Sequence, residues 1–170
     1  MPTTSNLVQK GLDRATVLSP SRKYRYCLWR SWGESVGRYV VFIGLNPSTA
    51  DESVDDPTVR RCVGFARRWG FESLCMLNLF AFRATRPTDL FKAKDPIGPI
   101  NDDFLRDLSR GASRVVACWG VHGAFQDRAA YVSQWVQGAK CLGLTKDGAP
   151  RHPLYVPYEA RLRLFRRAAV

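Results

Sequence analysis

Continuous apolar runs alternate along this chain with segments whose apolar residues recur at helical spacing. The runs over 38–45, 73–82 and 113–120 hold few polar residues, which is typical of strands covered on both faces of a sheet. An aromatic-rich stretch over 24–33 that ends in a turn at glycine predicts another strand, and 139–144 predicts a short one. The core strands of a sheet are therefore visible in the pattern.

The strongest helical pattern lies over 55–71. Asp56 suits the N-cap, Pro57 suits the first helical position, and Gly70 suits the end of the helix. A second helix is expected to be capped near Asn101. This second helix is predicted over 100–111, and further helices are predicted over 123–138 and 158–169.

Alternation of apolar strands with helices predicts an α/β fold, a three-layer sandwich with a mostly parallel central sheet. The 170 residues contain no repeat, low-complexity tract or linker, so one domain over 1–170 is expected. Residues 1–20 are polar and are expected to be poorly ordered at the start.

Polar residues follow the predicted core strands at the points where the strands end. In open α/β sheets, ligand sites gather at the carboxyl ends of the strands, so these residues predict a pocket. The clusters after the three core strands are Asn46-Pro47-Ser48, Asn78 with Arg83 and Arg86, and Trp119-Gly120. A fourth, Arg151-His152-Pro153, lies beyond the last predicted strand.

Three of these side chains have chemistry suited to a site. The Asn46 amide can orient a water or a hydroxyl but is a weak general base, and Pro47 makes its turn rigid; an ordinary structural turn is the alternative. A buried Asn78 can read a nucleobase edge or tie down a neighbouring loop. His152, with His122 as its rival, can donate a hydrogen bond to charge on a leaving group.

The formal net charge of +11 indicates an anionic partner, either nucleic acid or a nucleotide. Much of the excess is arginine, which binds phosphate through its planar fork. The expected phosphate contacts are Arg60, Arg61, Arg67 and Arg68. A solvated basic surface is the alternative.

An acidic group follows the first polar turn. Its carboxylates could hold Mg²⁺ for phosphoryl transfer, but capping of the next helix is the favoured interpretation, so no metal site is predicted. The group consists of Asp51, Glu52, Asp55 and Asp56. The five cysteines form no CxxC pair and are expected in the core, and no cofactor is predicted.

A cytoplasmic location without membrane attachment is expected. No apolar run approaches the roughly 20 residues that span a bilayer, and the first residues lack a hydrophobic signal core.

Four short motifs occur in an order that resembles the uracil-DNA glycosylase superfamily. They are "GLNPS" (44–48), "MLNLFAFRATRP" (76–87), "SRVVACWG" (113–120) and "HPLY" (152–155). The chain is also similar to an uncharacterised bacterial and phage domain family through "GLNPSTAD", "DPTVRRCVGFARRWGF", "NLFAFRATRP", "DPIG" and "RHPLY".

The superfamily resemblance implies a glycosylase-like fold and roles for individual residues. Asn46 would position the attacking water, Asn78 would read the base edge, and His152 would stabilise the departing base anion. The other expected substrate contacts are Gly44, Pro47, Ser48, Arg83, Arg86 and Tyr155. Aromatic candidates for stacking on a base are Phe65, Phe80 and Phe82.

The predicted function is therefore that of a nucleobase-pocket protein that hydrolyses an N-glycosidic bond in nucleic acid or a nucleotide. Leu154-Tyr155 stands where duplex-acting members often carry a serine-rich loop, which favours a single-stranded, modified or nucleotide substrate. The alternatives are a non-catalytic nucleic-acid-binding module on the same fold and a metal-dependent phosphoryl-transfer enzyme.

Overall fold

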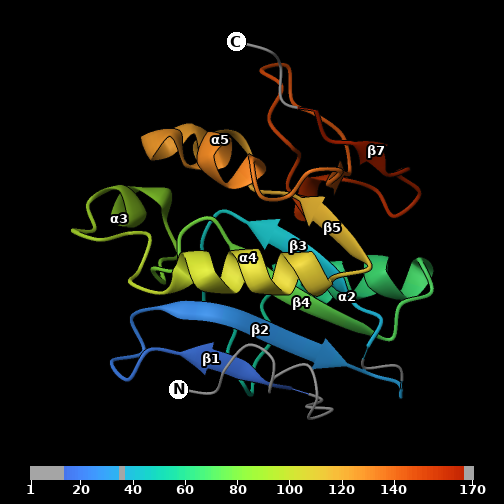
Figure 1. Ribbon diagram of the computed structural model, residues 1–170, viewed down its shortest axis with the longest axis horizontal. Helices are drawn as coiled ribbons and strands as arrows, with labels where there is room; N and C mark the ends of the chain where they lie inside the picture. The colour runs from blue at the N-terminus through green and yellow to red at the C-terminus, as the bar shows by residue number, and fades with distance from the viewer. Residues whose placement is uncertain (1–13, 35–36, 167–170) are drawn as a thin grey trace.

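A mixed sheet of seven strands runs through the residues that the computed structural model describes, 14–34 and 37–166 (Figure 1). The strands are β1 Thr16–Leu18, β2 Arg25–Ser31, β3 Val40–Gly44, β4 Ser73–Asn78, β5 Arg114–Ala117, β6 Lys140–Cys141 and β7 Arg163–Leu164. Their order across the sheet is β1-β2-β4-β3-β5-β6-β7. The α/β class predicted from the sequence is confirmed.

The sheet is parallel only at its centre. Strands β4, β3, β5 and β6 pair in parallel, whereas the β1–β2, β2–β4 and β6–β7 pairs are antiparallel. The expectation of a mostly parallel sheet is therefore wrong at both edges. A parallel neighbour requires a long crossover, and β1 leads into β2 through a short turn that can only produce an antiparallel pair.

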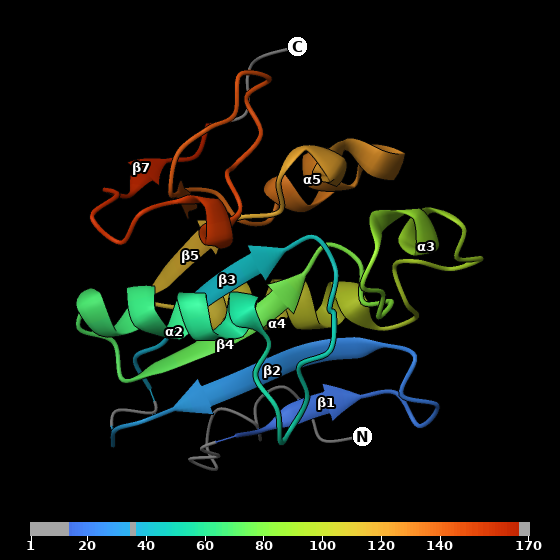
Figure 2. The same ribbon diagram turned by 180° about the vertical axis from the view of Figure 1, so that it is seen from behind.

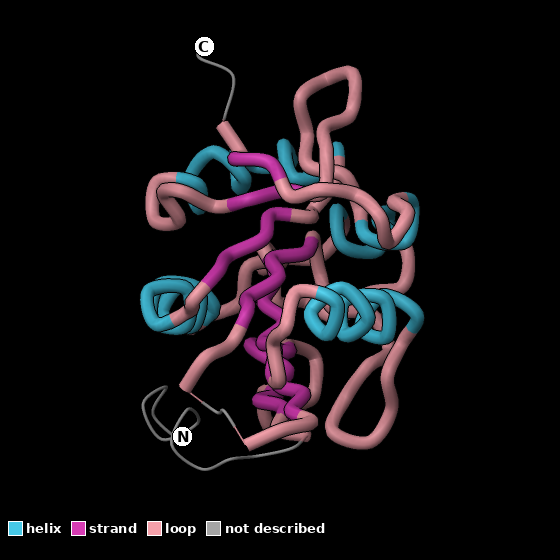
Figure 3. The backbone as a smooth tube through the Cα atoms, turned by 90° about the vertical axis from the view of Figure 1, so that its right-hand side faces the viewer, coloured by secondary structure: helices cyan, strands magenta, loops and turns pink. Residues whose placement is uncertain are grey.

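Helices lie on both faces of the sheet (Figure 3). Helix α4 crosses one face and α2 lies on the opposite face, in front of the sheet in Figure 2. The helices are α2 Pro57–Arg68, α3 Pro87–Phe91, α4 Asn101–Gly111 and α5 Arg128–Ser133, with 3₁₀ turns η1 Val121–Asp127 and η2 Pro153–Tyr155. Within the described ranges, none of these helices has the length and apolar character to cross a bilayer.

Strand β3 belongs to two hydrophobic cores, one on each face of the sheet. Val41 and Ile43 pack into the core that includes residues of α4, and Val40 and Phe42 pack into the core that includes residues of α2. All five residues of β3 are buried. Coverage on both faces explains why this strand is a continuous apolar run rather than an alternating one.

Helix α2 begins and ends where its sequence predicts. The Asp56 side chain accepts a hydrogen bond from the Val59 backbone N–H at 2.9 Å, and Pro57 occupies the first helical position. Gly70 follows the helix with a φ of +76°, a left-handed conformation that glycine adopts without strain. The N-terminus of α2 is therefore anchored by Asp56.

Two predicted helices are wrong in extent or in type. Only Arg128–Ser133 of 123–138 is α-helical, because Gln126 and Asp127 have positive φ values and break the helix. Within 158–169 the described residues form no helix, and Arg163–Leu164 is a strand paired with β6. The sequence "RLRLF" (161–165) alternates polar and apolar residues, which is the period of a strand.

Three local features differ from their expectations. Residues Thr16–Leu18 form β1 inside the segment 1–20 that is expected to be poorly ordered; residues 1–13 lie outside the described residues. Pro87–Phe91 forms a short helix inside a predicted loop. Asn101 does not cap α4, because the N-cap is Ile100, and its amide bonds to the end of β4 instead.

Truncation of Phe42 tests the importance of β3. Phe42 is fully buried, so Phe42→Ala is expected to lower the free energy of unfolding by about 3–5 kcal/mol in denaturant titrations. Val54, which is 57% exposed, provides the control, because Val54→Ala should change that value by less than about 0.5 kcal/mol. Equal decreases in the free energy of unfolding for the two variants would contradict the burial of Phe42 in the core.

Candidate functional site

The carboxyl ends of β3, β4 and β5 open onto a cavity of about 600 Å³. In Figure 2 the arrowheads of β3 and β4 point to the same side of the molecule, toward α3. The first turn of α2 and the loops around His122, Thr145 and His152 complete the walls. The structure thus brings segments far apart in the sequence around one space.

Six of the thirteen predicted site residues line this cavity. They are Gly44, Asn46, Ser48, Asn78, His152 and Tyr155. The other predicted residues lie outside the lining: Pro47, Arg60, Arg61, Arg67, Arg68, Arg83 and Arg86. The aromatic candidates Phe65, Phe80 and Phe82 also lie outside it, and its aromatic side chains are Trp119, His122, His152 and Tyr155.

Asn46 is half-buried, and its amide nitrogen holds a neighbouring loop. It donates to the backbone oxygens of Pro47 at 3.0 Å, Phe82 at 3.4 Å and Ala84 at 2.8 Å. Because three acceptors face this nitrogen, the orientation of the amide is settled. The side-chain oxygen accepts no hydrogen bond from the described residues and is available to orient a ligand group or a water.

Asn78 ends β4 and is buried beside β3. Its oxygen accepts from the Arg25 guanidinium at 3.3 Å, and a Cβ on Gly44 would lie 3.0 Å from its amide nitrogen. The Asn101 amide and the buried Arg128 guanidinium bond to the backbone oxygens at the end of this strand. The Asn78 amide is thus fixed with its oxygen toward Arg25, and its nitrogen remains a donor.

His152 lines the cavity, and one hydrogen bond determines which nitrogen of its neutral ring carries the proton. Its Nδ1 accepts from the Leu154 backbone N–H at 3.3 Å, which places the proton of the neutral ring on Nε2. Burial lowers the pKa of His152, and the negative charge of Asp56 acts in the opposite direction. The neutral imidazole with Nε2–H is therefore favoured near pH 7.

The segment that carries His152 is fastened to two other elements. Arg61 of α2 donates to the backbone oxygens of Pro153, at 3.3 Å, and Val156, and its guanidinium stacks 3.7 Å from the centre of the Tyr158 ring. The Gly120 backbone N–H donates to the Pro150 oxygen at 2.9 Å. Arg61, an expected phosphate contact, therefore positions the His152 segment.

The other predicted arginines are also engaged in the fold. Arg83 bonds to the backbone oxygens of Arg22, Ser48 and Thr49, and Arg86 pairs with Asp89 at 3.1 Å. On the outer side of α2, the exposed side chains of Arg67 and Arg68 contact aromatic rings, and Arg60 bonds to the Asp55 backbone. Arg68 also pairs with Glu159 at 3.6 Å. The side chains of Arg60, Arg67 and Arg68 are exposed, and phosphate contact by them stays a prediction.

The carboxylates of the acidic group over 51–56 contact arginine side chains or accept hydrogen bonds from backbone N–H groups. Asp51 and Glu52 pair with Arg22, and Asp55 pairs with Arg14 and with Arg30. Two backbone N–H bonds, followed by the charge of Arg22, lower the pKa of Asp51. Among the described residues no group of three or more His, Cys, Asp or Glu side chains is placed to hold a metal ion.

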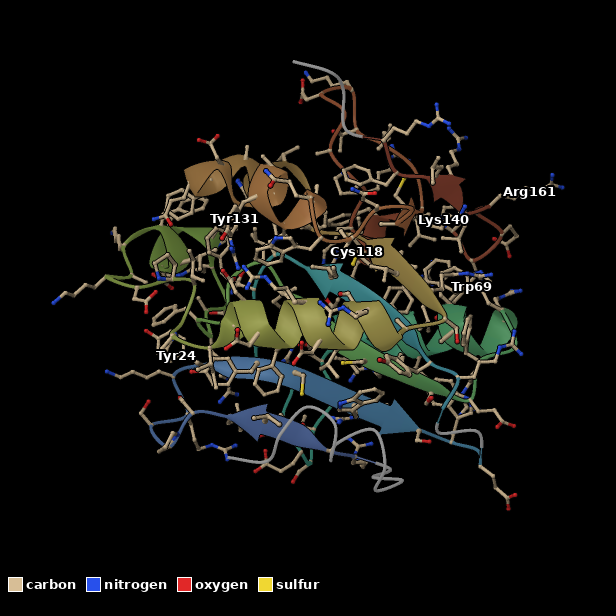
Figure 4. All side chains as sticks on the ribbon, viewed as in Figure 1. Tyr24, Trp69, Cys118, Tyr131, Lys140 and Arg161 are labelled. Carbon is tan, nitrogen blue, oxygen red and sulfur yellow. The ribbon has the colours of Figure 1, made fainter. Side chains whose placement is uncertain are left out.

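Cys118 directly follows β5 (Figure 4). It is one of the residues that line the cavity. Its thiol is fully buried and donates to the Ile43 backbone oxygen at 3.3 Å. Burial raises its pKa to about 12. A protonated thiol is a poor nucleophile, so Cys118 contributes a wall of the cavity and not a covalent step.

Sequence reasoning missed Arg25 and the cavity-facing position of Asp56. Both line the cavity, and both are more than 90% buried. Arg25 donates to the Ala50 backbone oxygen at 2.9 Å and to Asn78, and burial lowers its pKa to about 10, so it stays charged at neutral pH. An arginine inside the aromatic-rich strand 24–33 was the available signal for a buried charge.

Comparison with known proteins places this chain in one family. The family described as "Protein of unknown function (DUF1643)" matches residues 25–154. The chain belongs to this family. The matched residues extend from Arg25 to Leu154 and thus include the three strand ends and His152. The expected membership of an uncharacterised family is therefore confirmed, and this match shows no link to the uracil-DNA glycosylase superfamily.

No curated protein and no solved structure matches the chain. The chemistry of this DUF1643 protein must therefore be argued from the cavity itself.

Glycine at position 44 is required by the Asn78 amide. Gly44→Ala would place a Cβ 3.0 Å from the Asn78 nitrogen and is expected to lower the free energy of unfolding by about 1–3 kcal/mol. Gly37→Ala is the matched control, since a Cβ there meets nothing within 4 Å. If denaturant titrations show no difference between the two variants, the close packing of Gly44 on Asn78 is wrong.

The half-buried His152 predicts a pH dependence of stability. Its folded pKa lies below the ordinary value of 6.5, so the unfolded chain binds the proton more tightly, and stability decreases as the pH falls below 6.5. His152→Gln should remove this part of the decrease. NMR titration of the ring and denaturant unfolding across this range provide the measurements; a folded pKa at or above 6.5 would contradict the prediction.

Proposed function

We propose that this protein binds a nucleobase-containing ligand in the cavity and hydrolyses its N-glycosidic bond. One observation carries the proposal: Asn46, Asn78 and His152 line the same cavity, which lies at the carboxyl ends of β3, β4 and β5. The order of the sequence motifs supports a glycosylase-like form of the α/β fold. The cavity volume of about 600 Å³ falls in the range of small-molecule sites.

The polar groups of the cavity suit both the attack of water and the departure of the base. The Asn46 oxygen orients the attacking water, and the Nε2–H of His152 donates to the departing base. Asn78 supplies an amide donor to the base edge, with its oxygen already bonded to Arg25. Trp119 and Tyr155 supply aromatic surface in the same walls.

Asp56 supplies the base that an asparagine cannot provide. One carboxylate oxygen caps α2, and the second accepts no hydrogen bond from the described residues. In the proposed step the water oxygen bonds to the anomeric carbon and its proton moves to Asp56. The glycosidic bond breaks, and its electron pair leaves with the base.

Asp56→Asn is the sharpest test, because asparagine caps a helix as well as aspartate does but cannot take the proton. Release of free base, followed by mass spectrometry, is expected to fall at least about 100-fold. Because the cap hydrogen bond is retained, the variant should still unfold cooperatively in denaturant titrations, at a lower stability that reflects the loss of a buried charge near Arg25. The substrates to screen are nucleotides and single-stranded and duplex nucleic acids that carry normal and modified bases.

Arg110→Met serves as the control, because Arg110 is exposed on α4 and does not line the cavity. Asn46→Ala is a poorer test, since it also removes three hydrogen bonds from the fold. If the screen shows salt-dependent binding and no released base, the hydrolase proposal is wrong and a non-catalytic binding module is supported.

A further inference from the structure

Three arginines are buried in the described part of the chain, and only two of them have an acidic partner. Arg30 pairs with Asp55 at 2.6 Å, and Arg128 pairs with Asp102. Arg25, which is 3% exposed and lies on the same strand as Arg30, forms no ion pair with any described residue. A buried charge without a partner is costly, so this arginine requires an explanation.

The hydrogen bonds of Arg25 are also incomplete. A guanidinium has five N–H donors. Arg25 donates one hydrogen bond to the Ala50 backbone oxygen and one to the Asn78 side-chain oxygen. Its Nε is buried without a partner. Arg30, in contrast, donates to Asp55 and to two backbone oxygens. Donors thus remain unused on a charged group that lines the cavity.

The surroundings of Arg25 favour an anion. The first turn of α2, represented by Thr58, lines the same cavity, and a helix N-terminus attracts negative charge. The other charged or titratable groups in the lining, besides the buried Cys118 thiol, are Asp56, His122, Arg151, His152 and Tyr155. The charge of Asp56 acts favourably on Arg25, but this carboxylate caps α2 and makes no ion pair with it.

We infer that Arg25 is an internal receptor for a terminal phosphate, and that the ligand of this cavity is a mononucleotide. The inference rests on the proposed function for the nucleobase part of the ligand. Guanidinium and phosphate match in geometry and charge. Because Arg25 is almost fully buried, a phosphate must enter the cavity to reach it. A terminal phosphate can do so, whereas an internal phosphodiester is flanked by nucleotides on both sides.

Calorimetric titration of the full chain tests this inference. The ligands are nucleoside 5′-monophosphates, the matching nucleosides, inorganic phosphate, and single-stranded oligonucleotides with and without a terminal phosphate. The wild type should bind at least one monophosphate at least about tenfold more tightly than its nucleoside. Arg25→Met should abolish this preference, Arg25→Lys should reduce it, and the exposed control Arg110→Met should retain it.

Equal binding of nucleoside and monophosphate by the wild type would overturn the inference, as would a preference that survives in Arg25→Met. Tighter binding of oligonucleotides without a terminal phosphate would also overturn it. If Arg25→Met fails to fold, Arg25→Lys and the thermal shift of the wild type by inorganic phosphate decide the question. If Arg25→Lys keeps the full preference and inorganic phosphate does not shift the thermal unfolding of the wild type, Arg25 does not bind phosphate and the inference is wrong.

The two proposals fail separately. A phosphate preference that depends on Arg25, without release of base from any substrate, retains the receptor and removes the hydrolase. Base release from substrates that lack a terminal phosphate, with no preference for monophosphates, retains the hydrolase and removes the receptor.

Discussion

Parallel pairing of β3 with β4 on one side and with β5 on the other determines where this protein can bind a ligand. Parallel strands end at the same edge of a sheet, so the residues after each strand meet there although they are far apart in the sequence. Buried polar side chains then fix that edge. Asn101 and Arg128 bond to the end of β4, and Cys118 bonds to the end of β3.

The central strands and α2 could be predicted because their signals are local. Val40–Gly44 is apolar throughout, and Asp56 and Pro57 mark a helix start by their own chemistry. The edges of the sheet could not, because short strands such as Arg163–Leu164 depend on a partner that the pattern does not name. The basic stretch over 158–169 therefore predicts a helix where the structure has a short strand.

The candidate site was predictable to the extent that it follows strand ends. Asn46 and Asn78 are predicted in this way, and His152 is predicted from its turn-rich segment and the order of the motifs; all three line the cavity. Arg25 was not found, because it reaches the cavity from the beginning of an antiparallel strand, where no rule for parallel sheets applies. Arg61 was assigned to phosphate because a sequence shows charge but not the carbonyl oxygens that surround a side chain.

Helix α2 connects the groups of the cavity mechanically. Asp56 caps its N-terminus, and its Arg61 donates hydrogen bonds to the backbone of the segment that follows His152. The Asp56 carboxylate and the segment that carries the His152 imidazole are thus both connected to helix α2. The opposite wall, at Asn46 and Asn78, lies at the ends of β3 and β4 instead. A substitution that alters the packing of α2 would therefore change one wall of the cavity and leave the other in place.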